Sequence, residues 1–436
     1  MSEAPISKEI IDAKIKQLHI PDVGKASIRE IVALVNLVEA ETGIKYVRME
    51  MGVPGLPPSK IGVDAEIEAL KRGVASIYPM IDGIQPLKEE TARFVKNFMN
   101  IDVNPRGCIP TVGSMQGTFA AFQAAGNIDK KKDTLLFIDP GFPVQKQQMM
   151  VLGLKYKTFD VFNFRGEKLR DKLKSYLSKG NINAIVYSNP NNPSWICFNE
   201  EELKIIGELA NEYDVIVMED LAYFGMDFRR NFSTPGVPPY QPTVANFTNN
   251  FVLFISSSKI FSYAGQRCGL MVIPDALYDR KYPDLQKRFS SATFGSTITL
   301  RLLYSISSGT SHSAQWAVAA MLKGANEGRF NFVDDVKEYG ERAHKMKQFF
   351  LANGFQLVYK TDLEEPLADG FYFTVSYRGM TGNELVANLL YYGISAIALD
   401  NTGSDEEGIR ACVSFVQRNQ FEELEQRLQL FHKNFG

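Results

Sequence analysis

Short apolar runs recur through the middle of the chain, and amphipathic stretches separate them. The runs are GCIPTV (107–112), LLFID (135–139), AIVYS (184–188), VIVMED (215–220), FVLFIS (251–256) and CGLMVI (268–273). Several are apolar at nearly every position, as strands buried on both faces of a parallel sheet are. Between them, residues 167–180 and 200–213 have the apolar spacing of amphipathic helices. This alternation predicts an α/β fold with a mostly parallel sheet between helices.

The pattern changes toward both ends of the chain. Residues 26–43 predict one helix that follows a serine and ends at a glycine, and the proline-rich residues 52–60 predict an irregular link. Near the C-terminus we expect a long helix from about residue 333 to Gly354, then a strand at 371–377 and a helix at 381–391. Strands and helices at both ends indicate a second, smaller lobe.

Two domains are therefore expected. The larger is an α/β domain over residues 56–325, and the smaller is an α+β domain formed by residues 1–55 and 326–436. A chain of 436 residues is long enough for two such cores.

Composition and charge exclude several classes of protein. The apolar fraction is 45%, the charged fraction is 22% and the formal net charge is −2, which argues against a nucleic-acid-binding surface. The N-terminus has no signal-peptide core, and no apolar run approaches the length of a membrane span. The four cysteines are scattered without a C-x-x-C pair, and the four histidines lack metal-binding spacing. We expect a cytoplasmic protein without a metal.

Polar residues follow five of the apolar runs. The sequences are GSMQGT, PGF, NPNNP, DLAY and SSK, and each begins where a predicted strand ends. Ligands of open α/β sheets bind beyond the carboxyl ends of the strands, so these residues are expected to line one crevice. Turn chemistry alone explains the glycines and prolines, but it leaves Asp220, Lys259 and Arg267 unexplained.

Each of these three residues has a structural and a chemical interpretation. Asp220 either caps the next turn or faces a cationic ligand group, since a buried carboxylate is costly without donors. Lys259 is either a lysine at a strand end with its ammonium in solvent, or a desolvated amine nucleophile that forms a Schiff base with a carbonyl. Arg267 either makes a surface ion pair or supplies a bidentate fork for a phosphate or carboxylate.

Together with their neighbours, these residues describe one ligand. Gly113-Ser114 precedes a helical pattern, so it is either a plain serine cap or a helix N-terminus whose amides, including those of Met115 and Gln116, bind an anion. The hydroxyls of Ser256 and Ser258 and the fork of Arg267 complete a phosphate site. The ring of Phe142 supplies a stacking surface, and Asp220 a partner for a ring nitrogen. Pyridoxal 5'-phosphate (PLP) meets these demands, with Lys259 as its tether.

The segment SSSKIFSYAGQRCG (256–269) resembles the motif S-x-S-K-x-x-x-x-x-G-x-R-x-G of the class I/II aminotransferases, which are PLP enzymes of fold type I. The resemblance extends over nearly the whole chain and includes NPNNP (189–193) and DLAY (220–223) in the same order. It implies that Lys259 is the Schiff-base lysine, that Asp220 pairs with the pyridine nitrogen, and that Asn192 and Tyr223 contact the phenolic oxygen.

The resemblance also gives roles to four further positions, and for Phe142 it agrees with the stacking role inferred above. Phe142 in DPGFP occupies the place of the ring-stacking aromatic residue, and Tyr78 in YPMIDGIQPL that of a tyrosine that reaches the phosphate of a neighbouring subunit. The second role implies a homodimer with shared active sites. Gly52 in MGVP and Arg410 in GIRACVSF occupy positions that contact the substrate carboxylate, as does Asn192.

One departure affects the substrate side. The family continues NPNNP with Thr-Gly, whereas this chain has Ser194-Trp195. The tryptophan either reshapes the edge of the site or packs beneath the loop, and we expect packing.

The predicted activity is transfer of an amino group from an L-amino acid to a 2-oxo acid in a ping-pong cycle, with Lys259, Asp220 and Tyr223 as the catalytic residues. A carbon–sulfur β-lyase on the same scaffold is the alternative, since it would use the same cofactor residues. A cofactor-sensing DNA-binding regulator would need an added domain, and about 25 residues before the first long helix are too few. The sequence leaves the identity of the amino acid and the oxo acid open.

Overall fold

The computed structural model describes residues 4–436, and the chain divides into two compact units. We call them the large unit (56–190 and 197–336) and the small unit (4–55, 191–196 and 337–436 of the described residues). The predicted boundary at 325/326 thus differs from the observed one at 336/337, and residues 191–196 belong to the small unit. Residues 1–3 of the predicted small domain lie outside the described residues.

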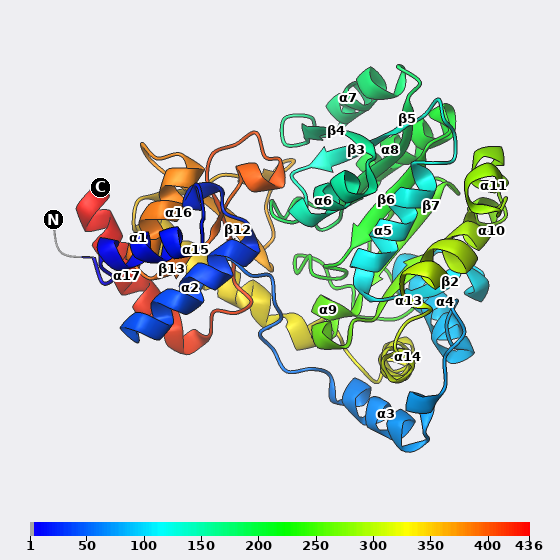
Figure 1. Cartoon of the computed structure of the whole chain (residues 1–436), viewed down its shortest axis with the longest axis horizontal. Helices are drawn as coiled ribbons and strands as arrows, with labels where there is room; N and C mark the ends of the chain where they lie inside the picture. The colour runs from blue at the N-terminus through cyan, green and yellow to red at the C-terminus, as the bar shows by residue number, and fades with distance from the viewer. Residues whose placement is uncertain (1–3) are drawn as a thin grey trace. The chain divides into compact units, whose positions relative to one another are not determined.

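The large unit is built on a seven-stranded sheet of order β2-β8-β7-β6-β5-β3-β4 (Figure 1). Its strands are β2 (Cys108–Thr111), β3 (Thr134–Asp139), β4 (Lys155–Asp160), β5 (Ile182–Ser188), β6 (Ile216–Leu221), β7 (Phe251–Ser256) and β8 (Gly269–Val272). Strand β8 runs antiparallel to both β2 and β7, and the other neighbours are parallel. The predicted, mostly parallel α/β sheet is confirmed.

Strand directions decide where the polar residues gather. Because β2 and β7 are each antiparallel to β8, they point the same way, and β3, β5 and β6 share that direction. The five strands that end in polar sequences therefore end at the same edge of the sheet. The pattern missed β4, which pairs only with β3 and whose side chains alternate between exposed and half-buried at its start.

Helices surround this sheet, and their ends follow local sequence signals. Asn199 caps α8 in a capping box with Glu202, and Gly153 ends α6 in the left-handed conformation. The helices of the large unit are α3 (Lys60–Lys71), α4 (Gln85–Met99), α5 (Gly113–Ala125), α6 (Pro143–Leu152), α7 (Glu167–Leu177), α8 (Glu200–Tyr213), α9 (Ser257–Ile260), α10 (Asp275–Tyr278), α11 (Pro283–Phe289), α12 (Phe294–Thr297), α13 (Tyr304–Ser307) and α14 (His312–Asn326).

A cluster of phenylalanines explains the later domain boundary. Phe332 packs against Phe94, Phe98 and Phe224 with ring centroids 5.1 to 6.1 Å apart. Burying these rings holds the segment after α14 in the large unit. The predicted long helix accordingly does not begin at residue 333: a short 3-10 turn (Asp334–Val336) comes first, and α15 (Glu338–Ala352) starts in the small unit.

The small unit contains a four-stranded antiparallel sheet of order β14-β15-β12-β9. Its strands are β9 (Phe355–Leu357), β12 (Tyr372–Tyr377), β14 (Ile397–Ala398) and β15 (Ile409–Cys412). Two short pairs accompany it: β1 (Val47–Arg48) with β13 (Ile394–Ser395), and β10 (Thr361–Asp362) with β11 (Glu365–Pro366). The helices are α1 (Lys8–Gln17), α2 (Ile28–Thr42), α15, α16 (Gly382–Tyr391) and α17 (Phe421–Phe435).

Helices α2 and α16 lie where the sequence predicted them. Their ends follow local signals: both helices start with a capping box, and α2 ends at Gly43 in the left-handed conformation. None of the helices in residues 4–436 combines the length and apolar character needed to cross a membrane.

Candidate functional site

The start of α5 is suited to bind an anion. Gly113 opens the helix at φ 64°, and its N–H donates to the carbonyl of Arg267 (3.0 Å). The guanidinium of Arg267 lies against Gly113, since a Cβ on that glycine would lie 2.1 Å from Nη2. A helix N-terminus next to an arginine fork favours a phosphate.

Ser114 does not act as the cap of α5. The residue at the cap position is Val112, and no side chain caps the helix there. The hydroxyl of Ser114 is buried and has no hydrogen-bond partner among the described residues. A buried hydroxyl without a partner is costly, so Ser114 fits the role of a ligand contact better than that of a cap.

The side-chain amide of Gln116 and the backbone carbonyl of Met115 have partners within the protein. Gln116 accepts from the backbone N–H of Val112 (2.7 Å) and donates to the hydroxyl of Ser307 (2.6 Å), so its amide already has partners. The carbonyl of Met115 accepts from Gln148 (2.7 Å). What these two residues offer an anion is their backbone N–H at the start of the helix.

Asp220 lies at the end of β6, on the side of the sheet that α5 covers. Its Oδ1 accepts from the N–H of Ala222 (3.1 Å), so it does cap the turn, while Oδ2 accepts from Gln145 (2.9 Å). Burial raises the pKa of Asp220 to about 6, and the hydrogen bonds from Ala222 and Gln145 and the charge of Lys259 counteract that rise. The carboxylate is thus ready to pair with a cationic ring nitrogen.

Gln145 is a site residue that the sequence analysis missed. It lies in the first turn of α6, three residues after Phe142, and it is buried. Phe142 is half-buried at the residue before that helix, so one helix start carries both the predicted stacking ring and the donor to Asp220. The spacing of Phe142 and Gln145 by one helical turn was the available signal.

Lys259 lies in the short helix α9, directly after β7. The hydroxyl of Ser256 accepts from the N–H of Ser258 (3.2 Å), and that of Ser257 donates to the carbonyl of Cys268. Lys259 and Ser258 are half-buried, and Lys259 interacts electrostatically with Asp220. The residue Lys259 is therefore only partly removed from solvent.

Tyr223 is buried in the turn after β6, three residues from Asp220. The same strand carries Glu219, which alternation directs to the opposite face of the sheet. Glu219 accepts from the hydroxyl of Thr243 (2.6 Å) and the N–H of Val244 (3.2 Å), and burial raises its pKa to about 7 against these bonds. Two adjacent acidic residues at the end of an apolar strand were the signal for this second carboxyl.

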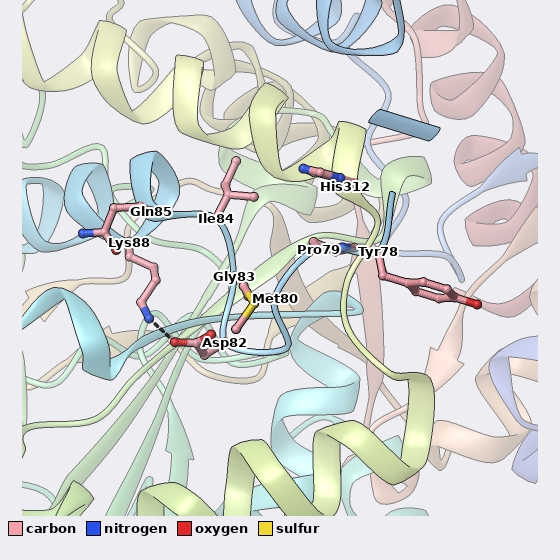
Figure 2. Close-up of a pocket in the computed structure, with 9 residues that line it drawn as sticks. All are labelled: Tyr78, Pro79, Met80, Asp82, Gly83, Ile84, Gln85, Lys88 and His312. Atoms are coloured by element: carbon pink, nitrogen blue, oxygen red, sulfur yellow. Dashed lines mark hydrogen bonds and ion pairs between the residues drawn. The ribbon is translucent and has the colours of Figure 1, made fainter. Parts of the chain in front are cut away.

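Tyr78 lies at the surface of the large unit. It borders a hollow of about 450 Å³ that also contains Met80, the Asp82–Lys88 ion pair and His312. Figure 2 shows the ring of Tyr78 directed away from that ion pair. With 87% of its surface exposed, Tyr78 contributes nothing to the core of its own chain.

The small unit holds the residues expected on the substrate side. Arg410 lies in β15 and is 1% exposed. Its Nη1 donates to the Oδ1 of Asn192 (3.4 Å), and its Nη2 to the backbone carbonyl of Glu50. The guanidinium lies 4.7 Å from the ring centroid of Tyr372, another residue that the sequence analysis missed.

Arg410 lacks an acidic partner among residues 4–436, and its Nε–H has no acceptor there. The carboxylate of nearby Glu50 is occupied by Arg48 (2.9 Å) and by the hydroxyl of Ser395 (2.6 Å). Buried charges are normally paired, and the buried Arg342 of the same unit does face a carboxylate. Arg410 is therefore suited to bind an anionic group from a ligand.

The turn at 191–196 and Gly52 complete this side. Asn191 closes the turn by accepting from the N–H (3.1 Å) and the hydroxyl (2.7 Å) of Ser194. A Cβ on Gly52 would lie 2.1 Å from the hydroxyl oxygen of Tyr372. Trp195 is buried against Tyr372, which agrees with the expected packing.

The described residues of the large unit fit PLP. The amides at the start of α5, the unpartnered hydroxyl of Ser114 and the guanidinium of Arg267 suit its phosphate. Asp220 suits its ring nitrogen, and Lys259 its aldehyde. Each of these groups was predicted from the sequence. The hydrogen bond from Gln145 to Asp220 was not.

Comparison with known proteins gives a consistent result. The sequence profile of a family described as aminotransferase class I and II matches residues 45–428. A probable aspartate aminotransferase of Methanocaldococcus jannaschii is 24% identical over 344 residues, covering 78% of this chain and 80% of that protein. An LL-diaminopimelate aminotransferase of Natranaerobius thermophilus is 24% identical and covers 79% and 83%.

Solved structures agree on the fold. An aspartate aminotransferase from Thermus thermophilus with maleate superposes with a TM-score of 0.75, at 18% identity, covering 94% of this chain and 96% of that one. An aspartate aminotransferase from Thermotoga maritima superposes with a TM-score of 0.74, covering 96% and 99%.

Proposed function

Because the chain belongs to the class I and II aminotransferase family, we propose that it is a PLP-dependent aminotransferase that transfers the amino group of an L-amino acid to a 2-oxo acid. The observation that carries the proposal is Arg410, a buried cation without an acidic partner among the described residues. An α-carboxylate is the group that amino acids and 2-oxo acids share. A planar guanidinium binds it in a bidentate manner.

The large unit would hold the cofactor. Ser114, Arg267 and the amides at the start of α5 would bind the phosphate, Lys259 would bind the aldehyde covalently, and the ring of Phe142 would stack on the pyridine. Bound PLP would withdraw electrons from the substrate and make the proton on its α-carbon labile.

The chain's own groups would then manage protons and orientation. The ionised Asp220 would keep a proton on the ring nitrogen, and Gln145 and Ala222 would keep Asp220 ionised. The Nζ of Lys259 would accept the proton from the substrate α-carbon. Asn192 and Tyr223 would form hydrogen bonds with the phenolic oxygen of PLP. Arg410 would bind first the amino acid and then the oxo acid, as a ping-pong cycle requires.

A β-lyase would use the same cofactor residues. The curated relatives named above are aminotransferases, and three kinds of substrate appear in the names of such relatives: aspartate, LL-diaminopimelate and kynurenine. These substrates have the α-amino carboxylate in common. Transfer of an α-amino group is therefore the activity we propose, without a choice among the side chains.

We also propose a homodimer. Tyr78 and Met80 are 87% and 72% exposed and lie beside exposed Ile77. Such an apolar surface suits contact with a second copy, and the resemblance assigns Tyr78 to the phosphate of that copy. The scattered cysteines favour the cytoplasm as the compartment.

The test is amino-group transfer by the purified PLP-loaded protein, with 2-oxoglutarate as acceptor and a panel of L-amino acids as donors. Arg410→Lys keeps the charge but loses the planar fork, so we expect its kcat/KM to fall by ~10- to 100-fold, mainly through KM. Arg427→Lys is the matched control, because Arg427 is buried but paired with Glu423. Formation of pyruvate and ammonia without an acceptor would instead indicate the lyase, and an unchanged KM in Arg410→Lys would contradict the role of Arg410.

A further inference from the structure

Trp195 adopts a backbone conformation that bulky residues rarely take. Its φ is 64°, in the left-handed region. Its N–H donates to the carbonyl of Asn191 (3.1 Å), and the N–H of Asn191 donates to the carbonyl of Ile196 (2.9 Å), which fixes the turn. Glycine occupies this region without a steric cost. The chain carries a tryptophan here despite the strain, so its side chain needs a compensating role.

The indole ring of Trp195 is fully buried, with 1% of the residue exposed. It meets the ring of Tyr372 edge to face, with centroids 6.1 Å apart and an interplanar angle of 66°. On another side it covers Gly370, where a Cβ would lie 2.1 Å from Cε2 and 2.3 Å from Nε1 of Trp195. Trp195 and Gly370 are therefore complementary in shape, because any larger residue at position 370 would displace the indole.

Tyr372 connects Trp195 to Arg410. In the register of β12 with β15, Tyr372 lies opposite Cys412 and Thr374 opposite Arg410, so Tyr372 and Arg410 are diagonal neighbours on one face. The guanidinium carbon lies 4.7 Å from the centroid of Tyr372, and the hydroxyl of Tyr372 lies against Gly52. The tyrosine ring is thus confined by the indole, by the guanidinium and by the backbone of Gly52.

We propose that Trp195 is a positioning residue for substrate binding: it fixes the ring of Tyr372, and Tyr372 holds the guanidinium of Arg410 with its open N–H groups aligned for the carboxylate. The inference rests on the proposed function. A bidentate fork binds strongly only if its orientation is set before the ligand arrives, because ordering it on binding costs affinity. The stacked ring and the two acceptors, Asn192 Oδ1 and the carbonyl of Glu50, set that orientation.

Loss of the indole therefore has a specific consequence. The Tyr372 ring gains freedom, and the carboxylate of every substrate is held more weakly. The carboxylate is bound equally in the ground state and in the transition state, so the loss appears in KM and leaves kcat nearly unchanged. Amines without a carboxylate do not use Arg410, so their slow reaction stays at the wild-type rate.

The experiment compares Trp195→Gly, Trp195→Phe and the control Trp316→Phe in the PLP-loaded enzyme. Trp316 is the only other tryptophan, and it stacks on Arg72 in the large unit (4.4 Å). We expect Trp195→Gly to raise KM by ~10-fold or more for amino acid and oxo acid alike, with kcat within ~3-fold. Trp195→Phe keeps an aromatic edge and recovers most of the affinity, and Trp316→Phe leaves KM unchanged.

Two further measurements separate positioning from a general loss of structure. The inhibition constant of 3-phenylpropionate, an unreactive carboxylate, rises in parallel with KM. Gly370→Ala raises KM as Trp195→Gly does, and the double variant is no worse than either single one, because both changes remove the same contact. Should Trp195→Gly not fold, Gly370→Ala carries the test.

The proposal is overturned if Trp195→Gly lowers kcat while KM is unchanged, or if 3-phenylpropionate binds all variants equally. It is also overturned if Trp195→Gly lowers kcat/KM for methylamine, which has no carboxylate, by the same factor as for amino acids. Wild-type protein that transfers no amino group from any α-amino acid would refute the proposed function itself. Binding of 3-phenylpropionate would then still report on Trp195.

Discussion

The bond from Gln145 to Asp220 makes a quantitative prediction. Gln145→Leu keeps the approximate volume of the side chain and removes the donor that lies 2.9 Å from Oδ2 of Asp220. The other bond to this carboxylate, from the N–H of Ala222 at 3.1 Å, is part of the backbone and remains. The variant therefore changes a single interaction of a buried charge.

The expected size of the effect follows from that bond. A hydrogen bond to a charged group contributes ~1.5–3 kcal/mol, and 1.36 kcal/mol corresponds to one pKa unit, so the pKa of Asp220 rises by ~1–2. It starts from about 6, where burial already raises it above the ordinary value of an aspartate. In the PLP-free variant it would therefore lie at ~7–8. A cationic ring nitrogen lowers the pKa of Asp220 in the wild type and in the variant alike, so the difference of ~1–2 units remains in the PLP-loaded enzyme. A larger share of Asp220 is then neutral at pH 7 and cannot hold a proton on the ring nitrogen.

The assay is the pH dependence of kcat/KM with a good amino-acid substrate. The acidic limb, where activity is lost as Asp220 takes up a proton, moves toward higher pH in Gln145→Leu by ~1–2 units. Gln148→Leu is the matched control: Gln148 is buried on the same helix but bonds to Thr118 and Met115. An unmoved limb in Gln145→Leu, or an equal displacement in both variants, would refute the assignment of this bond.

Two other predictions concern Ser114 and Glu219. Ser114→Ala should bind PLP ~10- to 100-fold more weakly, because it loses a hydrogen bond to a charged phosphate. The PLP-free variant should unfold at no lower temperature than the wild type, because the Ser114 hydroxyl has no partner there. In the control Thr118→Val, whose hydroxyl does have partners, thermal melts should show a lower unfolding temperature and titrations should show unchanged PLP affinity. In the folded protein the pKa of Glu219 is about 7, above the ordinary glutamate value of 4.5 that holds in the unfolded chain. The folded state therefore binds a proton more tightly, and the free energy of unfolding falls by ~3 kcal/mol as pH rises from about 4.5 to about 7. Denaturant titrations of the PLP-free protein should show this loss in the wild type and not in Glu219→Gln; equal pH dependence of the two would contradict it.

The sequence contained the information for the sheet and its polar edge. Near-continuous apolar runs identify buried strands, and β2, β3, β5, β6, β7 and β8 were all predicted from them. Strand β4 was missed because an edge strand is partly exposed and its alternating pattern resembles a loop or a helix end. The observed boundary at 336/337 differs from the predicted one at 325/326, because the packing of Phe332 on distant phenylalanines leaves no local signal.

The predicted cofactor residues were recognisable because their chemistry is unusual at a strand end. Asp220, Lys259 and Arg267 are each unusual beside a buried strand, and the resemblance to the aminotransferases, the family whose profile matches residues 45–428, predicted their roles. Gln145 and Tyr372 do not stand out in the sequence, because a glutamine in a helix and a tyrosine in a strand are common. Their importance follows only from contacts made across the fold, with Asp220 and with Arg410.

Trp195 is an intermediate case. The sequence marked it as a departure from the family, and burial was the expected outcome. The cost of its left-handed backbone, the space reserved by Gly370 and the line of contacts to Arg410 depend on geometry that no sequence pattern specifies.

The most direct test of the whole account is the identity of the residue that binds the PLP aldehyde. Purified protein is incubated with PLP, treated with borohydride to make any covalent link permanent, digested, and analysed by mass spectrometry. We predict a single modified peptide that contains Lys259, and no modification at that peptide when Lys259 is replaced by arginine. Unmodified Lys259, or a label spread over the other lysines, would contradict the account.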